Sequence, residues 1–201
     1  WSVTGVQTCA LPIYLTRDLD AQVTRQMLAG LPAARVLELG CGTGKNTAFL
    51  TGMAREMLAL DFSSGMLAQA RARLPQARFV RADLTQPWPC PAAHFDLIVG
   101  NLVLEHIADL GFIFGQAARA LKPGGRCFVC ELHPFRQYQG KKAVFEHGAG
   151  SAEIDAFTHH ISEFIDAAQA SGLALRHFGE WWHGEDIDKP PRLASFLFER
   201  A

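Results

Sequence analysis

A glycine-rich segment is the first part of this sequence that can bind a ligand. Glu38 is followed by Gly40, Gly42 and Gly44 in the run E-L-G-C-G-T-G, between an expected strand and the start of an expected helix. Glycines let the backbone turn tightly and let a ligand approach the main chain. The pattern therefore predicts a nucleotide- or cofactor-binding loop, and three kinds of loop compete for it.

The residues around the loop distinguish these three kinds. A P-loop, G-x-x-x-x-G-K-[ST], aligned on Gly44 and Lys45 needs glycine at Leu39 and serine or threonine at Asn46, and both requirements fail. The dinucleotide fingerprint G-x-G-x-x-G/A needs a small residue where Lys45 stands, because its third glycine permits close helix packing. The third kind, G-x-G-x-G, wraps a ligand without a pyrophosphate, and the sequence favours it.

Acidic residues lie on or after the first three expected strands. Asp61 ends the strand at 56–60, 21 residues after the first glycine of the loop, where its carboxylate can accept hydrogen bonds from both hydroxyls of a ribose. Its alternative role is a helix N-cap. Asp83 follows the strand at 77–81, and a turn-capping role is its alternative. Glu38 lies on an otherwise apolar strand, where a carboxylate is costly unless it is paired.

Alternating strands and helices must position these side chains. The alternation recurs about every 20 to 25 residues, which predicts right-handed βαβ units and a parallel sheet. The expected strands are residues 35–39, 56–60, 77–81, 95–99, 126–132, 173–182 and 193–199, and the expected helices are 16–29, 46–52, 66–74, 110–121 and most of 153–172. Ser63 or Ser64 is the expected cap of the third helix. We expect one α/β domain over residues 14–201, with 136–160 as a lid or insertion.

The composition bounds the class of protein. The chain has 201 residues, 49% of them apolar and 19% charged, with a net charge of -1. We therefore expect a soluble domain that binds no nucleic acid and has no membrane span, since it lacks a basic face and an apolar run of about 18 residues. Five scattered cysteines favour a reducing, cytoplasmic compartment. Cys127 and Cys130 form a C-x-x-C, but on a strand they point to opposite faces, so no metal site is expected there.

Residues 1–13 are treated separately from the rest of the chain. They carry no charge and lack the basic start and cleavage site of a signal peptide. Residues 3–13 resemble the conceptual translation of a sequencing-adapter oligonucleotide fused in frame to a truncated gene. We therefore expect residues 1–13 to be non-native and the native chain to begin upstream of Tyr14. An ordinary flexible or strand-forming N-terminus is the alternative.

Five motifs, in order and at the right spacing, resemble the class I S-adenosylmethionine-dependent methyltransferases. They are E-L-G-C-G-T-G at 38–44, L-D-F-S at 60–63, A-D-L at 82–84, F-D-L-I-V at 95–99 and L-K-P-G-G-R at 121–126. The segment L-E-H-I at 104–107 is similar to the small-molecule type, methyltransferase domain family 11. The resemblance covers about residues 14–201. It implies a Rossmann-like fold with a seven-stranded, mostly parallel sheet, helices on both faces, and S-adenosylmethionine as the cofactor.

The resemblance also implies which positions contact the cofactor. Glu38 would face the methionyl amine, Asp83 the adenine amino group, and Asn101 the methionine portion. Phe62 and Met66 can pack against the adenine or belong to the core. The complete expected set is Glu38, Gly40, Cys41, Gly42, Gly44, Asp61, Phe62, Met66, Asp83, Leu84 and Asn101.

Methyl transfer itself makes few chemical demands. The sulfonium makes the methyl group a good electrophile, so the enzyme must chiefly align the acceptor and exclude water. A general base is needed only if the acceptor must lose a proton. The candidates are Glu105, His106, His133 and the His159–His160 pair. The first three follow two strands at the open edge of the sheet, and a structural role is the alternative for His106 and His133. His159 and His160 start a helical segment, and only one of the two rings can face substrate.

The sequence thus predicts methyl transfer from S-adenosylmethionine to a small-molecule acceptor by in-line displacement. The acceptor atom and the oligomeric state are left open. The alternatives are a non-catalytic S-adenosylmethionine-binding protein and a nicotinamide-dependent oxidoreductase. The dinucleotide fingerprint of the latter fits poorly, because it needs a small residue where Lys45 stands. Trp181 and Trp182 can form a wall of the acceptor pocket, a part of the core or an oligomer contact.

Overall fold

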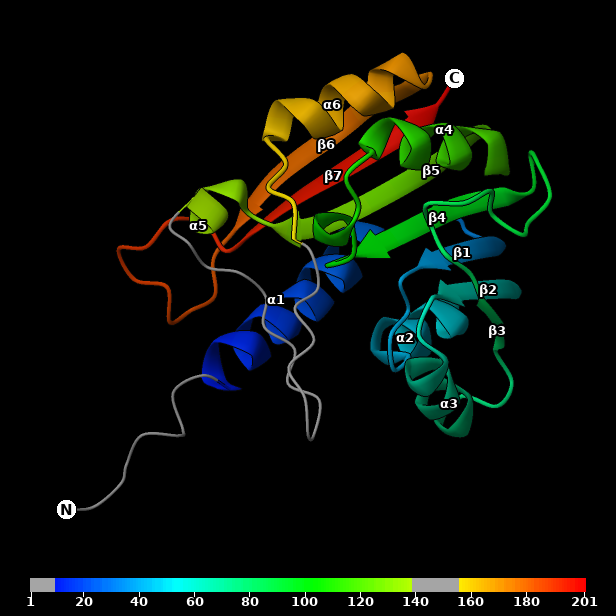
Figure 1. Ribbon diagram of the computed structural model, residues 1–201, viewed down its shortest axis with the longest axis horizontal. Helices are drawn as coiled ribbons and strands as arrows, with labels where there is room; N and C mark the ends of the chain where they lie inside the picture. The colour runs from blue at the N-terminus through cyan, green and yellow to red at the C-terminus, as the bar shows by residue number, and fades with distance from the viewer. Residues whose placement is uncertain (1–9, 139–155) are drawn as a thin grey trace.

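Seven strands form one sheet in the part of the chain that the computed structural model describes, residues 10–138 and 156–201. From one edge to the other the order is β3-β2-β1-β4-β5-β7-β6 (Figure 1). The strands are β1 (Arg35–Leu39), β2 (Glu56–Asp61), β3 (Arg78–Arg81), β4 (Phe95–Asn101), β5 (Leu121–Leu132), β6 (Leu173–Trp181) and β7 (Leu193–Arg200).

One strand of this sheet runs against the others. β7 is antiparallel to both of its neighbours, β5 and β6, whereas every other neighbouring pair is parallel. The predicted seven-stranded, mostly parallel sheet is therefore confirmed. Because β7 reverses between them, β6 runs in the same direction as β5. The carboxyl ends of all strands except β7 consequently lie at one edge of the sheet.

Helices cover both faces of the sheet. On one face lie α1 (Ala10–Leu28), α2 (Lys45–Met53) and α3 (Ser64–Arg73), and on the other lie α4 (Leu110–Ala120) and α6 (Ile161–Ala170) (Figure 1). Successive strand residues point to opposite faces, so Val36 and Leu37 of β1 belong to different cores. By the same rule Cys127 packs into one core and Cys130 into the other, as predicted.

Local signals account for where several helices begin. The Ser63 hydroxyl accepts a hydrogen bond from the Met66 backbone N–H at 3.3 Å and so forms the predicted N-cap of α3. Asp109 caps α4 in the same way, through the Phe112 backbone N–H at 2.9 Å. These caps satisfy backbone donors that have no partner within the first turn of a helix.

β5 and α6 begin at other residues than predicted, because strand pairing and helix capping decide their starts. β5 begins at Leu121, five residues before the predicted start, because Leu121 pairs with Phe95 of β4 across a register shift. α6 begins at Ile161, whereas most of 153–172 was expected to be helical. His160 is its N-cap, and the His160 backbone N–H donates to the Glu163 carboxylate at 2.6 Å.

The structure describes only part of the N-terminal segment and of the expected insertion. α1 begins at Ala10, six residues before the predicted start of the first helix. Of the expected lid at 136–160, residues 139–155 lie outside the described residues, and 136–138 belong to the short helix α5 (Pro134–Tyr138). None of the described helices combines the length and the apolar character needed to cross a membrane.

Candidate active site

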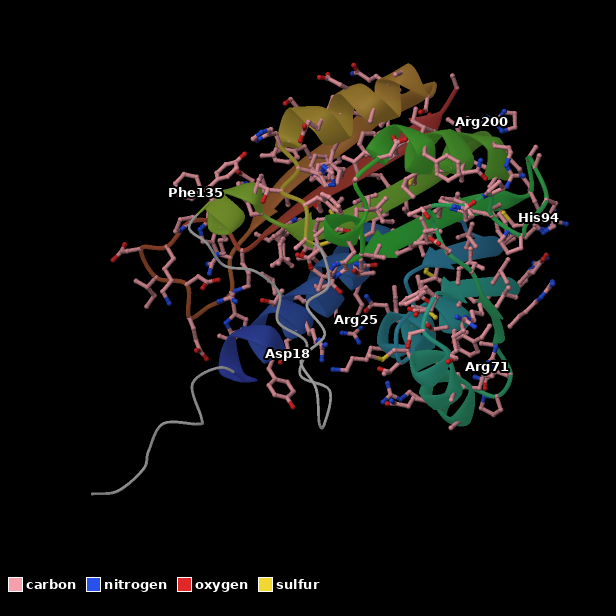
Figure 2. All side chains as sticks on the ribbon, in the orientation of Figure 1. Asp18, Arg25, Arg71, His94, Phe135 and Arg200 are labelled. Carbon is pink, nitrogen blue, oxygen red and sulfur yellow. The ribbon has the colours of Figure 1, made fainter. Side chains whose placement is uncertain are left out.

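The carboxyl edge of the sheet gathers nearly all of the predicted site residues. The loops after β1, β2, β4 and β5 meet there, as expected for a sheet whose order reverses between β1 and β4. Figure 2 marks the two edges: Phe135 follows β5 at the carboxyl edge, while His94, which precedes β4, lies at the opposite one. Most of the predicted site residues therefore lie on one side of the molecule.

The glycine loop and Asp61 form a single hydrogen-bonded unit. One Asp61 carboxylate oxygen accepts from the Gly42 backbone N–H at 2.7 Å, and the other accepts from the Ser63 backbone N–H at 2.8 Å. A carboxylate has about four acceptor positions, so these two bonds fix its orientation and leave capacity for a ligand. Asp61 is thus positioned by the loop as well as by its own strand.

The glycines of this loop have left-handed backbone conformations. Gly40 has a φ of 65°, and a Cβ added there would lie 2.4 Å from Cγ2 of Val103. Gly42 has a φ of 53°, and a Cβ there would meet nothing within 4 Å. Gly44 also has positive φ and stands as the N-cap of α2. Gly40 is therefore required by packing against the turn after β4, whereas Gly42 borders open space.

Glu38 is buried on β1 with a hydroxyl as its partner. Its carboxylate accepts from the Thr47 hydroxyl of α2 at 2.5 Å, and the residue is only 4% exposed. Burial raises the pKa of Glu38 to about 7, and the nearby carboxylates of Asp20 and Asp61 add to the increase. Two acidic neighbours and one hydroxyl create a negative environment that a cationic group would relieve.

A buried residue of α1, Asp20, connects the glycine-loop side of the site with β4. Its two carboxylate oxygens accept from the Asn46 amide at 2.9 Å and the Asn101 amide at 2.6 Å. The Asn101 amide also donates to the Thr24 hydroxyl at 2.8 Å, and its carbonyl oxygen has no hydrogen-bond partner among the described residues. Sequence reasoning missed Asp20, because it lies 81 positions from Asn101 and no local pattern links the two.

The other expected cofactor residues are less enclosed. Asp83 is exposed and accepts from the Thr85 backbone N–H at 2.9 Å and its hydroxyl at 2.7 Å, which lowers the pKa of Asp83. It therefore caps a turn, which was its alternative role. Phe62 is 66% exposed beside the half-buried Met66. Leu84 and Cys41 are buried, and burial raises the pKa of the Cys41 thiol.

Glu105 and His106 lie together on a short 3-10 helix, η1 (Leu104–His106), directly after β4. Glu105 is buried, whereas the His106 side chain keeps 20% of its surface exposed. The His106 Nε2 lies 3.8 Å from a Glu105 carboxylate oxygen. An imidazole next to a carboxylate is a pair of groups that can accept and release a proton.

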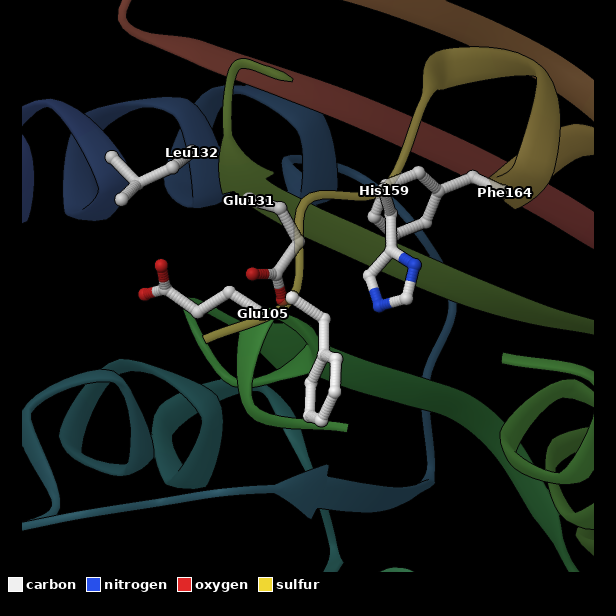
Figure 3. Close-up of a pocket in the computed structure, with 6 residues that line it drawn as sticks. Glu105, Glu131, Leu132, His159 and Phe164 are labelled. Carbon is white, nitrogen blue, oxygen red and sulfur yellow. The ribbon is translucent and has the colours of Figure 1, made fainter. Parts of the chain in front are cut away.

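A small cavity behind η1 is lined by a carboxylate that sequence analysis missed. Glu131 of β5 is 3% exposed, and one of its oxygens accepts from the backbone N–H groups of Val103 and Leu104, each at 3.0 Å. Figure 3 shows its carboxyl group between Glu105 and His159. The cavity holds about 10 Å³, which is the room of one water molecule. Burial and the Glu105 carboxylate raise the pKa of Glu131 to about 8.

The remaining histidines of this edge are held by other groups. His133 accepts from the Phe135 backbone N–H at Nδ1 (3.2 Å), so its Nε2 carries the proton and donates to Glu180 at 2.9 Å. His159 is buried and donates from Nε2 to the Ile107 carbonyl at 2.8 Å. His160 points elsewhere, toward the Tyr138 hydroxyl. As expected, the adjacent His159 and His160 separate, and only the first lines the cavity.

A buried ion cluster anchors the loop between β6 and β7 at the same edge. The Asp186 carboxylate contacts the guanidinium groups of Arg192, at 2.6 and 2.8 Å, and Arg136, at 2.9 Å. Burial opposes ionisation, but the hydrogen bonds from the two arginines hold the pKa of Asp186 well below its usual range. Arg192 also donates to Thr16 of α1 at 3.1 Å, which ties this loop to the first helix.

The two tryptophans of this region differ in exposure. The Trp181 indole donates to the Ser195 hydroxyl inside the sheet, whereas Trp182 is 49% exposed at the start of the loop. No three His, Cys, Asp or Glu side chains gather as possible metal ligands anywhere in residues 10–138 or 156–201.

Comparison with known proteins connects this chain to one family. A model of a methyltransferase domain matches residues 37–129. A relative from Mycolicibacterium smegmatis, named a probable S-adenosylmethionine-dependent methyltransferase, is 30% identical over 185 residues, covering 76% of this chain and 70% of the relative. A trans-aconitate 2-methyltransferase from Methylobacterium nodulans is 41% identical over 169 residues, covering 82% of this chain and 61% of that protein.

Solved structures share the fold. The crystal structure of an S-adenosylmethionine-dependent methyltransferase from Mesorhizobium loti superimposes with a TM-score of 0.76 at 24% identity, covering 89% of this chain and 96% of that one. One from Clostridium acetobutylicum gives 0.74 at 15% identity, covering 92% of each chain. The chain spans 33% to 61% of the length of three curated relatives, the protein from Methylobacterium nodulans among them. A methyltransferase-domain model matches residues 37–129, and the chain covers 70% of the Mycolicibacterium smegmatis relative at 30% identity. This chain therefore belongs to the S-adenosylmethionine-dependent methyltransferases.

Proposed function

We propose that this chain transfers a methyl group from S-adenosylmethionine to a small-molecule acceptor by in-line displacement. The observation that carries the proposal is the unit formed by the glycine loop and Asp61, in which both carboxylate oxygens are oriented by backbone N–H groups. That unit presents an acceptor for ribose hydroxyls beside a loop whose Gly42 leaves room for a ligand.

The residues present fit the methionine end of the cofactor. The carbonyl oxygen of Asn101 is buried without a partner among the described residues, and Glu38 is buried beside two other carboxylates. A ligand ammonium would supply the hydrogen-bond donors and the positive charge that this region lacks. We therefore assign Glu38 and Asn101 to the amine, and Asp61 to the ribose. When bound, the cofactor supplies a methyl group on a sulfonium, which the acceptor atom displaces.

The adenine end is assigned to the loops after β2 and β3. Phe62, just before α3, offers an exposed ring, and Met66, in the first turn of that helix, offers a half-buried side chain. The proposal keeps Asp83 and the backbone of Leu84 as the adenine contacts. In that role Asp83 would use the acceptor capacity that its two bonds from Thr85 leave.

On the acceptor side, η1 supplies the groups that can take a proton. We assign His106 and Glu105 as the first candidates for a general base, because they adjoin each other and His106 is partly exposed. His133 is the second candidate, since as a base at Nδ1 it would give up its bond from the Phe135 backbone N–H. The relatives named trans-aconitate 2-methyltransferases make small organic acids the first acceptors to screen.

We also propose a cellular compartment and a domain organisation for this chain. The cysteines at 41, 90, 127 and 130 are free, which supports a reducing compartment, and we propose the cytoplasm. A single sheet and its two helix layers support residues 14–201 as one methyltransferase domain.

Titration calorimetry tests the proposal directly. The wild-type chain should bind S-adenosylhomocysteine but neither NAD nor ATP, and Asp61→Ala should weaken that binding at least tenfold, or about 1.4 kcal/mol. The matched control is Asp166→Ala, an exposed carboxylate of α6. Binding of NAD in place of S-adenosylhomocysteine would support the oxidoreductase alternative. Binding without transfer to any member of an acceptor panel would favour the non-catalytic alternative.

A further inference from the structure

The turn after β4, residues 101–104, is held in an unfavourable conformation by β5. Leu102 has a φ of 50°, a left-handed backbone conformation that leucine rarely adopts. Such a residue persists only where the surroundings over-determine it. Here the Leu102 backbone N–H donates to the Cys130 carbonyl at 2.9 Å, and the next two N–H groups both donate to Glu131. Two acceptor atoms of one strand, the Cys130 carbonyl oxygen and one Glu131 carboxyl oxygen, therefore bind all three N–H groups.

We propose that Glu131 is a positioning residue for cofactor binding, which sets the 101–104 turn and, through Val103, the place of the glycine loop. This inference rests on the proposed function only because it names S-adenosylmethionine as the cofactor that binds there.

The connection to the loop is a direct packing contact. Val103 lies so close to Gly40 that a Cβ on Gly40 would approach Cγ2 and Cβ of Val103 to 2.4 and 2.8 Å. Any movement of the turn must therefore move Gly40, or open a gap beneath it. Asn101, assigned above to the methionine end, begins the same turn. Through its hydrogen bonds to the N–H groups at 103 and 104, Glu131 therefore restrains the backbone beside Gly40 and Asn101.

Glu131 also faces the small cavity that it shares with Glu105 and His159. Its second carboxyl oxygen is buried and has no hydrogen-bond partner among the described residues. Burial, and secondly the Glu105 carboxylate in the same small cavity, raise the pKa of Glu131 to about 8, so the side chain is favoured in its neutral form. A neutral side chain can keep accepting the two N–H groups at one oxygen while the other carries the proton.

Two substitutions separate positioning from proton transfer. Glu131→Gln keeps the length of the side chain and a carbonyl oxygen for both N–H groups, but it cannot ionise. Glu131→Asp keeps the carboxylate but is one methylene shorter, so it cannot reach both donors without a shift. Positioning requires Glu131→Gln to resemble wild type and Glu131→Asp to be defective. A role as a base requires the opposite order.

The first measurement is calorimetric binding of S-adenosylhomocysteine between pH 6.5 and 9.5. At pH 7, Glu131→Gln should stay within twofold of wild type, whereas Glu131→Asp should bind at least fivefold more weakly. Above about pH 8 the affinity of the wild type should fall more steeply than that of Glu131→Gln, because Glu38 and the ligand amine titrate alike in both proteins. The control is Glu199→Gln on the neighbouring β7, whose carboxylate pairs with Arg126 and Arg176 away from the cavity; it should follow the wild-type curve.

The second measurement needs no ligand. Amide hydrogen exchange at Val103 and Leu104 should be at least tenfold faster in Glu131→Asp than in wild type, and unchanged within twofold in Glu131→Gln. Unchanged protection in Glu131→Asp, or a Glu131→Gln variant as defective as Glu131→Asp, would overturn the inference. If none of the proteins binds S-adenosylhomocysteine, the proposed function fails, and exchange at these two amides still decides the role of Glu131.

Discussion

Replacing each of two neighbouring glycines by alanine should separate packing from ligand contact. Gly40 and Gly42 both have positive φ, so alanine at either position carries a conformational cost of about 1–2 kcal/mol. Only at Gly40 does the added methyl group overlap Val103, which should cost a further ~1–3 kcal/mol. We therefore expect Gly40→Ala to lower the free energy of unfolding by about 2–5 kcal/mol, and Gly42→Ala by about 1–2 kcal/mol.

Urea denaturation followed by circular dichroism measures the difference, and thermal melting provides a second reading. For a chain of this size, each kcal/mol corresponds to about 2–4 °C in Tm. Binding should respond differently from stability, because the methyl group of Gly42→Ala points into the open space beside the loop. That variant should lose at least tenfold in affinity for S-adenosylhomocysteine despite its smaller loss of stability. Equal stability of the two variants, or wild-type affinity in Gly42→Ala, would refute the reasoning.

Three further outcomes follow from the buried charges. Thr47→Val removes the hydroxyl that donates to Glu38 and should destabilise the protein by about 1–3 kcal/mol in urea titrations, whereas Thr47→Ser should restore most of the loss. The free energy of unfolding should fall as the pH rises from about 5 to 8. Burial raises the pKa values of Glu38 and Glu131, so the folded state binds more protons than the unfolded state over that range. In Glu131→Gln the free energy of unfolding should therefore depend less steeply on pH. Asp186→Asn leaves two buried guanidinium groups without their carboxylate and should cost about 3–5 kcal/mol, while the exposed Asp166→Asn should change stability by less than about 0.5 kcal/mol.

The elements were predictable where local chemistry decides them. Residues 35–39 form a strand with the predicted bounds, because the apolar run ends at the first glycine of the loop. Ser63, one of the two serines expected as the cap, caps α3 through the Met66 N–H. The opposite orientation of Cys127 and Cys130 followed from the period of a strand alone.

Asp20 and Glu131 could not be predicted from the sequence, because their contacts join residues that are far apart along the chain. Asp20 looks like one polar position on a helix, and only the folded chain brings it to Asn46 and Asn101. Glu131 ends an apolar strand much as Glu38 does, and that parallel was the one available signal for it. Its partners, the N–H groups at 103 and 104, are backbone groups that carry no residue-type information. Periodicity describes which face a residue occupies but not which remote group it meets.

The reversed direction of β7 has a practical consequence for handling the protein. Since β7 runs against its neighbours, its last residue, Arg200, lies at the edge of the sheet opposite the glycine loop (Figure 2). An affinity tag or a surface tether joined after Ala201 would therefore leave the cofactor edge facing solution. Immobilised protein can thus be used for the binding measurements, with every molecule presenting the same side to the ligand.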